Sequence, residues 1–133
     1  MELFDKDEFG RWMTQADYTL KSAENDMNGK FYSWACFKSQ QAAEYALKAL
    51  LSAIGEIPAG HSLSKLAEQL DENDFDCGEI KSACRRLDRL YIPTRYPDAY
   101  AEGSPNQYYE KKDATDAIGD ARRIISFARK RAD

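Results

Sequence analysis

Histidine and cysteine are scarce in this chain of 133 residues, and their scarcity limits the chemistry it can perform. There is one histidine, His61, and the three cysteines, Cys36, Cys77 and Cys84, form no CxxC pair. Structural zinc sites take most of their four ligands from these two residue types. With so few ligands we expect no metal site, no cofactor, and thiols that are reduced and mostly buried.

Long apolar runs are also missing. No segment approaches the ~20 consecutive apolar residues that a helix needs to cross a bilayer, and the N-terminus is acidic where a secretory signal would be basic and then apolar. We therefore expect a cytoplasmic protein with no membrane contact. The phosphate-loop pattern, a GxGxxG after a strand, and HExxH are absent too, which argues against the enzyme classes that use them.

The formal net charge is −4, so the molecule as a whole is not a polycation that binds nucleic acid through its total charge. Arginine and lysine are nevertheless concentrated in two places, 85–95 and 122–131. The interpretation that this pattern favours is a solvated helix face, with cations near a helix C-terminus. Any contact with RNA is therefore expected to be local.

Apolar residues recur every three or four positions through most of the chain, which is the spacing of an amphipathic helix. The first such helix begins at Asp5, whose carboxylate can accept a hydrogen bond from an exposed amide, and ends at 28–29. A second, without proline or internal glycine, covers about 30–54. One of its sides, beginning with Phe31 and Trp34, should pack inward through mainly small residues.

Three further helices follow. Ser62 can cap a third, shorter helix; a fourth ends before Pro93; and the last covers about 111–131. No segment alternates with period two, so strands are not expected. Short connections between amphipathic helices favour antiparallel neighbours. The sequence therefore predicts an all-α protein, an up-and-down bundle of four long helices plus one shorter helix, forming a single domain over 1–133.

The segment 91–110 loses the helical spacing and is rich in tyrosine. Loops beyond ~12–15 residues in a compact domain are commonly functional. Arg95 stands there between two prolines, with Tyr96, Asp98 and Tyr100 close by. A guanidinium held by a stiff backbone can bind phosphate or carboxylate with two parallel hydrogen bonds, and tyrosine rings can stack on bases. The sequence is equally compatible with Arg95 pairing with Asp98 or a helix carboxylate while the tyrosines cover the bundle end.

Three polar residues of the second helix, Gln41, Glu44 and Lys48, share one face by their spacing. Glu44 and Lys48 are four residues apart in the favourable order, so an exposed ion pair within the helix explains both. The functional hypothesis is that all three point at the arginine loop and line a polar groove.

Four short motifs occur in a fixed order: QQAAE at 40–44, LKALL at 47–51, GHSL at 60–63 and TRYPD at 94–98. This ordered set, within a match over about 12–128, resembles the prokaryotic HEPN family. The resemblance implies a helical bundle that usually forms homodimers and binds nucleotide or RNA. It also implies a minimal nucleotidyltransferase partner, encoded beside it in a toxin–antitoxin-like pair. Many members of the wider family are metal-independent endoribonucleases.

Those nucleases resemble one another in an Arg-x4-6-His motif, and this chain departs from it, because no histidine follows Arg95. Cleavage of RNA through its own 2′-hydroxyl needs a group that exchanges a proton near neutral pH, the natural role of histidine. His61 is either a loop residue that helps to start the third helix or, if it approaches Arg95 across a dimer interface, the group that restores catalysis.

The leading hypothesis is therefore a dimeric nucleotide- or RNA-binding protein, and the alternative is an endoribonuclease with a divergent site. The candidate ligand-binding residues are Arg95, Tyr96, Asp98, Tyr100, Gln41, Glu44, Lys48 and His61.

Overall fold

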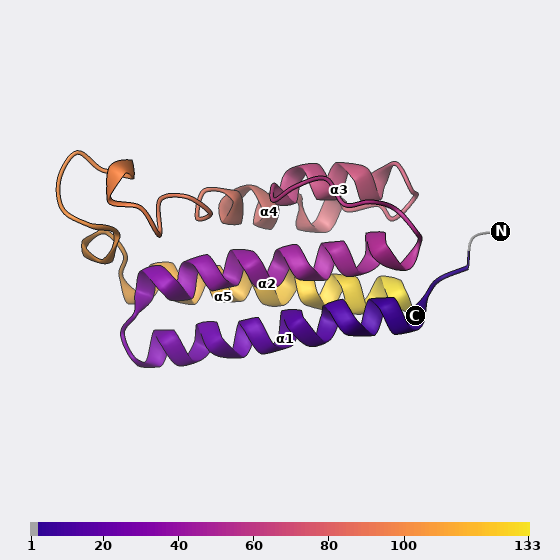
Figure 1. The fold of residues 1–133 in the computed structure, drawn as a ribbon, viewed down its shortest axis with the longest axis horizontal. Helices are drawn as coiled ribbons and strands as arrows, with labels where there is room; N and C mark the ends of the chain where they lie inside the picture. Colours follow the sequence, from indigo (N-terminus) through magenta and orange to yellow (C-terminus); the bar gives the residue numbers. More distant parts are fainter. Residues whose placement is uncertain (1–2) are drawn as a thin grey trace.

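The structure, a computed structural model, describes residues 3–133. All regular secondary structure in these residues is helical (Figure 1). The three long helices are α1 (Lys6–Asn28), α2 (Tyr32–Ala53) and α5 (Lys111–Ala132). The two short ones are α3 (Leu63–Asp71) and α4 (Lys81–Asp88). Single turns of 3-10 helix, labelled η1 to η3, cover Gly78–Ile80, Pro97–Ala99 and Pro105–Gln107.

Helix α1 runs antiparallel to α5. Asp17 and Glu24 of α1 pair with Arg129 and Arg122 of α5, so the residue numbers rise along one helix as they fall along the other. Helices α2 and α5 begin at the same end of the bundle, and the two chain termini lie at the opposite end (Figure 1). Helices α3 and α4 form a second layer in which α3 packs on α2 and α4 on α5.

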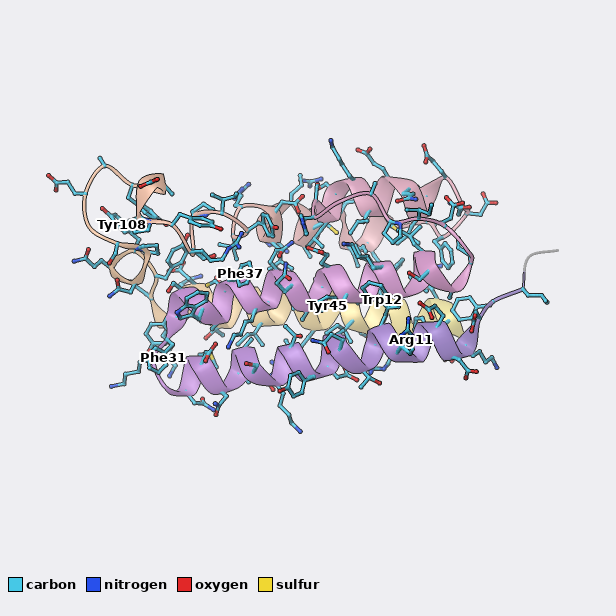
Figure 2. All side chains as sticks on the ribbon, viewed as in Figure 1. Arg11, Trp12, Phe31, Phe37, Tyr45 and Tyr108 are labelled. Atoms are coloured by element: carbon cyan, nitrogen blue, oxygen red, sulfur yellow. The ribbon has the colours of Figure 1, made fainter. Side chains whose placement is uncertain are left out.

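Helix α2 is the centre of the core, because it packs against all four other α-helices. Its leucines Leu47, Leu50 and Leu51 are completely buried, and its alanines allow the neighbouring helices to approach closely. The prediction that Phe31 and Trp34 also face inward is wrong, since they are 60% and 46% exposed. Phe31 lies just before α2, at the turn that follows α1 (Figure 2), and Trp34 lies in the first turn of α2.

The predicted all-helical bundle is confirmed, with a fourth helix that is shorter than expected. Helix α4 ends at Asp88, where the amide of Leu90 donates to the carbonyl of Leu87 in a tighter turn. Pro93, which has no N–H and disfavours helical backbone at Ile92, prevents the helix from resuming. Thr94, only 2% exposed, anchors the following turn through a hydrogen bond of 2.6 Å from its hydroxyl to the carbonyl of Leu90. Segment 89–110 then crosses to the far end of the bundle without an α-helix.

The caps predicted at Asp5 and Ser62 are confirmed, whereas the capping box that the sequence suggested for Asp76 and Glu79 before the fourth helix is not formed. The side chain of Asp5 accepts from the amide of Glu8 at 3.0 Å, and that of Ser62 accepts from the amide of Lys65 at 3.3 Å. Within residues 3–133, no helix is both long and apolar enough to cross a membrane.

Candidate functional site

The side chain of Glu44, in the middle of α2, is almost completely buried and surrounded by hydrogen-bond donors. It accepts from Lys48 at 2.9 Å, from Gln41 at 3.2 Å and from Gln40 at 3.3 Å. Nδ1 of His61 lies 3.0 Å from one carboxylate oxygen and 3.2 Å from the other. The predicted ion pair between Glu44 and Lys48 is thus present, but it is buried and not exposed. We call these five residues the Glu44 cluster.

His61 reaches Glu44 because the chain turns sharply between α2 and α3. Gly60, with φ at +74°, supplies a left-handed turn that other residues adopt with strain. Gln40 then donates to the backbone carbonyl of His61 at 3.1 Å, which holds the turn against α2. The imidazole also stacks on Tyr91, with ring centroids 4.8 Å apart and planes inclined by 20°. Its side chain remains 56% exposed.

Arg95 is half-buried within a group of aromatic rings. The centre of its guanidinium, Cζ, lies 4.2 Å from the ring centroid of Phe37, 4.5 Å from that of Tyr91 and 4.9 Å from that of Tyr96. Its Nε donates to the backbone carbonyl of Tyr91 at 2.8 Å. Among the described residues, Arg95 pairs with no carboxylate, Asp98 included, so the internal ion pair considered as an alternative is not formed.

We call Arg95 with Phe37, Tyr91 and Tyr96 the Arg95 site. Tyr91 joins it to the Glu44 cluster, because the imidazole of His61 and the guanidinium of Arg95 both lie against this one ring. Phe37 comes from α2, which also carries Glu44, and its position on that helix is marked in Figure 2. The two groups of residues therefore form one continuous site where α2 meets the start of α3 and the segment after α4.

Two of the candidate residues do not join this site. Asp98 is exposed in the turn Pro97–Ala99 and makes no hydrogen bond or ion pair with any described residue. Tyr100 stacks on Tyr108 with ring centroids 4.1 Å apart and donates to the hydroxyl of Tyr109 at 2.9 Å. Burial, together with this hydrogen bond, raises the pKa of Tyr109. Of these three tyrosines, Tyr109 packs against the buried core, and Tyr108 remains 47% exposed.

The site contains residues that the sequence did not single out as candidates, above all Phe37, Tyr91 and Gln40. Phe37 is seven residues before Glu44, two helical turns away and on the same side of α2, so the spacing could have suggested it. Tyr91 begins the tyrosine-rich segment but carries no signal that distinguishes it from the other tyrosines. Trp34 extends the aromatic surface, with its ring edge-on to Phe37 at 6.3 Å and almost half exposed.

The chemistry available here is anion binding and proton exchange. With Nε committed to Tyr91, the two terminal nitrogens of Arg95 can donate in parallel to a phosphate or carboxylate. Nδ1 of His61 is engaged by the carboxylate of Glu44. Nε2 of the half-exposed imidazole is therefore the nitrogen that can exchange a proton with a ligand. Residues 3–133 hold no group of three or more histidine, cysteine or acidic side chains placed to bind a metal ion.

Comparison with known proteins agrees with this architecture. The sequence pattern that defines the HEPN domain matches residues 9–131. Among solved structures, TT1696 from Thermus thermophilus is 39% identical, with a TM-score of 0.89, covering 92% of this chain and 97% of its own. ST0689, described as an archaeal HEPN homologue, is 37% identical with a TM-score of 0.80 and covers 94% of this chain and 98% of its own.

A third structure, a HEPN domain protein from Thermotoga maritima, is 32% identical with a TM-score of 0.72 and covers 90% of this chain and 95% of its own. No curated protein matches the chain significantly.

Proposed function

This chain belongs to the HEPN domain family, and from that premise we propose that it binds a nucleotide or RNA at the Arg95 site. The observation that carries the proposal is the state of Arg95 itself. Its guanidinium is half-buried and held by three rings and a backbone carbonyl, yet no carboxylate of residues 3–133 neutralises it.

A cation held in this way favours an anionic ligand. Tyr91 accepts from Nε and thereby orients the guanidinium, so that less side-chain entropy is lost when a ligand binds. A phosphate group can accept from both terminal nitrogens at once, which is the geometry that arginine recognises best. The rings around it also lower its exposure to water, and this strengthens its attraction for an anion.

Aromatic side chains next to Arg95 can bind the base of the same ligand. Tyr96, which contacts the guanidinium, and Trp34, which contacts Phe37, are each 46% exposed, so each leaves part of its ring open to a ligand. Base stacking on an aromatic ring contributes ~1–3 kcal/mol per base and tolerates different bases. A ligand that combines phosphate with an unpaired base fits this surface better than a bare anion does.

Binding can be tested with two probes, ADP and a short fluorescent single-stranded oligoribonucleotide. Arg95→Ala is expected to weaken both about tenfold or more, the loss that follows from removing a charge-assisted pair of hydrogen bonds. Arg11→Ala is the matched control, since Arg11 is an exposed arginine on α1, well away from the site (Figure 2). Unchanged affinity in Arg95→Ala would reject the proposal, and binding of only one probe would identify the ligand class.

A second candidate function, metal-independent cleavage of RNA, is favoured by the pair of Glu44 and His61. A carboxylate on Nδ1 orients an imidazole and stabilises its protonated form, so Nε2 can take a proton from a 2′-hydroxyl. Arg95 would then stabilise the charge that develops on the phosphate.

The two functions separate in a cleavage assay with EDTA present. If the chain is a nuclease, His61→Ala is expected to slow cleavage at least about a hundredfold, the usual contribution of a general base. Intact RNA after prolonged incubation with the wild-type protein would reject the nuclease function and leave binding as the only one of the two functions. His61→Gln serves as a control that keeps a polar side chain but cannot exchange a proton.

The family also suggests partners. A homodimer and a complex with a minimal nucleotidyltransferase, the two forming a toxin–antitoxin-like pair, are consistent with exposed aromatic residues at one end of the bundle, such as Phe31 and Trp34. Co-expression with any nucleotidyltransferase encoded by the adjacent gene, followed by purification through a tag on one chain only, tests the pairing. Recovery of the tagged chain alone would count against it.

A further inference from the structure

We infer that Glu44 is a positioning residue, which holds His61 so that its imidazole makes a second, pH-dependent contact with the ligand of Arg95. The inference rests on the proposed function, because it concerns how the same anionic ligand is held. It gives Glu44 a different role from the direct ligand contact expected from the sequence, since its carboxylate is buried and already fully occupied.

The hydrogen-bond partners of Glu44 determine which ring nitrogen of His61 carries a proton. Lys48, Gln40 and Gln41 all approach its oxygens with N–H groups, and an ionised carboxylate offers only lone pairs. Nδ1 of His61, 3.0 Å from the same carboxylate, must therefore carry a proton to make a hydrogen bond. In the neutral imidazole this leaves Nε2 as a proton acceptor, and in the charged imidazolium Nε2 becomes a donor.

The ring is fixed from several sides besides Glu44. Gln40 holds its backbone carbonyl, Tyr91 holds one face of the ring, and the residues after it are held by Asp88 of α4. The imidazole is therefore preorganised in one orientation, with more than half of its side chain open to solvent. Among the described residues, no hydrogen-bond partner engages Nε2, so this nitrogen is free to meet a ligand.

The charges around His61 explain the expected pH dependence. Helix α2 contributes Glu44 and Lys48, and the segment after α4 contributes Tyr91 and Arg95. Helix α4 contributes Asp88, which is hydrogen-bonded to the amide at the start of α3. Lys48 already compensates the charge of Glu44. A proton on His61 therefore adds one unit of positive charge beside the ring that Arg95 also contacts.

This charge determines in which direction the affinity for a phosphate ligand changes with pH. A histidine side chain in general gains its proton, and with it an extra charge and a second N–H donor, toward the acidic end of the range from about pH 5 to pH 8. Affinity for a phosphate ligand should then be higher at low pH and decrease as the proton is lost. For a contact that remains partly exposed, the expected decrease is about twofold to fivefold.

The experiment measures binding of a short single-stranded oligoribonucleotide without terminal phosphates, whose diesters keep one charge each across the range. Wild-type affinity should fall about twofold to fivefold between about pH 6 and pH 8. His61→Gln should bind at the wild-type high-pH level throughout, and Glu44→Gln should lose most of the pH dependence. A wild-type affinity that does not change with pH, or a His61→Gln variant that still follows the wild-type profile, would overturn the inference.

Because Glu44 is buried, Glu44→Gln could unfold the chain, and a second measurement on the wild type avoids this. His61 is the single histidine of the sequence, so nitrogen NMR of its imidazole has no overlap. The expected neutral form carries its proton on Nδ1, and a proton on Nε2 would contradict the role assigned to Glu44. Failure of the proposed function gives a different result, since Arg95→Ala would then leave oligoribonucleotide binding unchanged whatever the tautomer.

Discussion

The carboxylate of Asp88 accepts a hydrogen bond of 2.7 Å from the backbone amide of Leu63, the first residue of α3. Its other oxygen accepts from the amide of Ser64 at 3.1 Å and from the hydroxyl of Ser62 at 3.3 Å. A residue of α4 thus satisfies exposed amides at the start of another helix and places a negative charge at the positive end of its dipole. This contact ties α4 to α3 directly after His61, so it also supports the candidate site.

Asp88→Ala is expected to destabilise the fold by about 1–2 kcal/mol, because it removes a helix cap and its charge. Urea unfolding measures the effect. Asp88→Asn should also destabilise the fold, since asparagine has a single acceptor oxygen and cannot accept from the amides of both Leu63 and Ser64 as the carboxylate does. The NMR signal of His61 should shift in Asp88→Ala. Equal stability of the alanine variant and the wild type would show that the contact with Leu63 contributes nothing.

Tyr96→Ala should weaken binding of the oligoribonucleotide about fivefold or more, because a half-exposed ring next to Arg95 is lost. Tyr96→Phe keeps the ring and should bind like the wild type. Tyr18→Ala is the control, since Tyr18 is 72% exposed on α1. Fluorescence anisotropy gives the three affinities, and the stacking hypothesis is wrong if Tyr96→Ala and Tyr18→Ala behave alike.

Because its three cysteines are buried, we expect the protein to lose stability in alkali. Burial raises the pKa of Cys36, Cys77 and Cys84 from 9.0 to about 12. Above about pH 9 the unfolded chain therefore releases thiol protons that the folded chain retains, and the unfolded state is favoured. Each thiol should lower the free energy of unfolding by about 1 kcal/mol by about pH 10.

Urea unfolding at about pH 8 and pH 10 tests this for the wild type and for Cys84→Ala. The variant should lose about 1 kcal/mol less than the wild type over this interval, whatever its stability at the lower pH. A thiol reagent added to the native protein at neutral pH should react with none of the three cysteines, because they are buried. Rapid labelling of the native chain would contradict the burial on which this prediction depends.

The proposed homodimer predicts a sedimenting species of twice the 15.2 kDa chain mass. Phe31→Glu should shift the population toward monomer, because a charge would replace an exposed aromatic ring at the end of the bundle where α2 begins. Tyr18→Glu, on α1, should leave the dimer intact. A wild-type protein that sediments only as monomer across the concentrations at which it binds RNA would rule the dimer out.

Much of the fold could be predicted because its signals are local. Asp5 and Ser62 cap helices where the sequence placed the caps, and apolar spacing located all five α-helices. The end of α4 was placed too far along the chain, because the apolar spacing continues through Leu90, whereas the amide of Leu90 already donates to the carbonyl of Leu87 in a tighter turn. Phe31 and Trp34 have the correct spacing for burial, but at this end of α2 it is Ser33, Ala35 and Cys36 that are buried, while Phe31 and Trp34 stay exposed.

The candidate site was predicted only in part. Gln41, Glu44 and Lys48 share a helix face, and Arg95 is linked to Glu44 through Tyr91 and His61. Asp98 and Tyr100 were included because they are close to Arg95 in sequence, and neither contacts it. In an irregular segment, residues that are close in sequence can point in different directions, because successive side chains follow no fixed period.

The sequence by itself determined which segments become helices and which polar side chains share a face, because both depend on residues within a few turns of one another. Only the tertiary structure decided that His61, seventeen residues after Glu44, donates to that carboxylate. It also decided that the ring of Tyr91 contacts both this imidazole and the guanidinium of Arg95. Such contacts depend on how whole helices dock, and docking is set by the summed packing of the core and not by any local pattern.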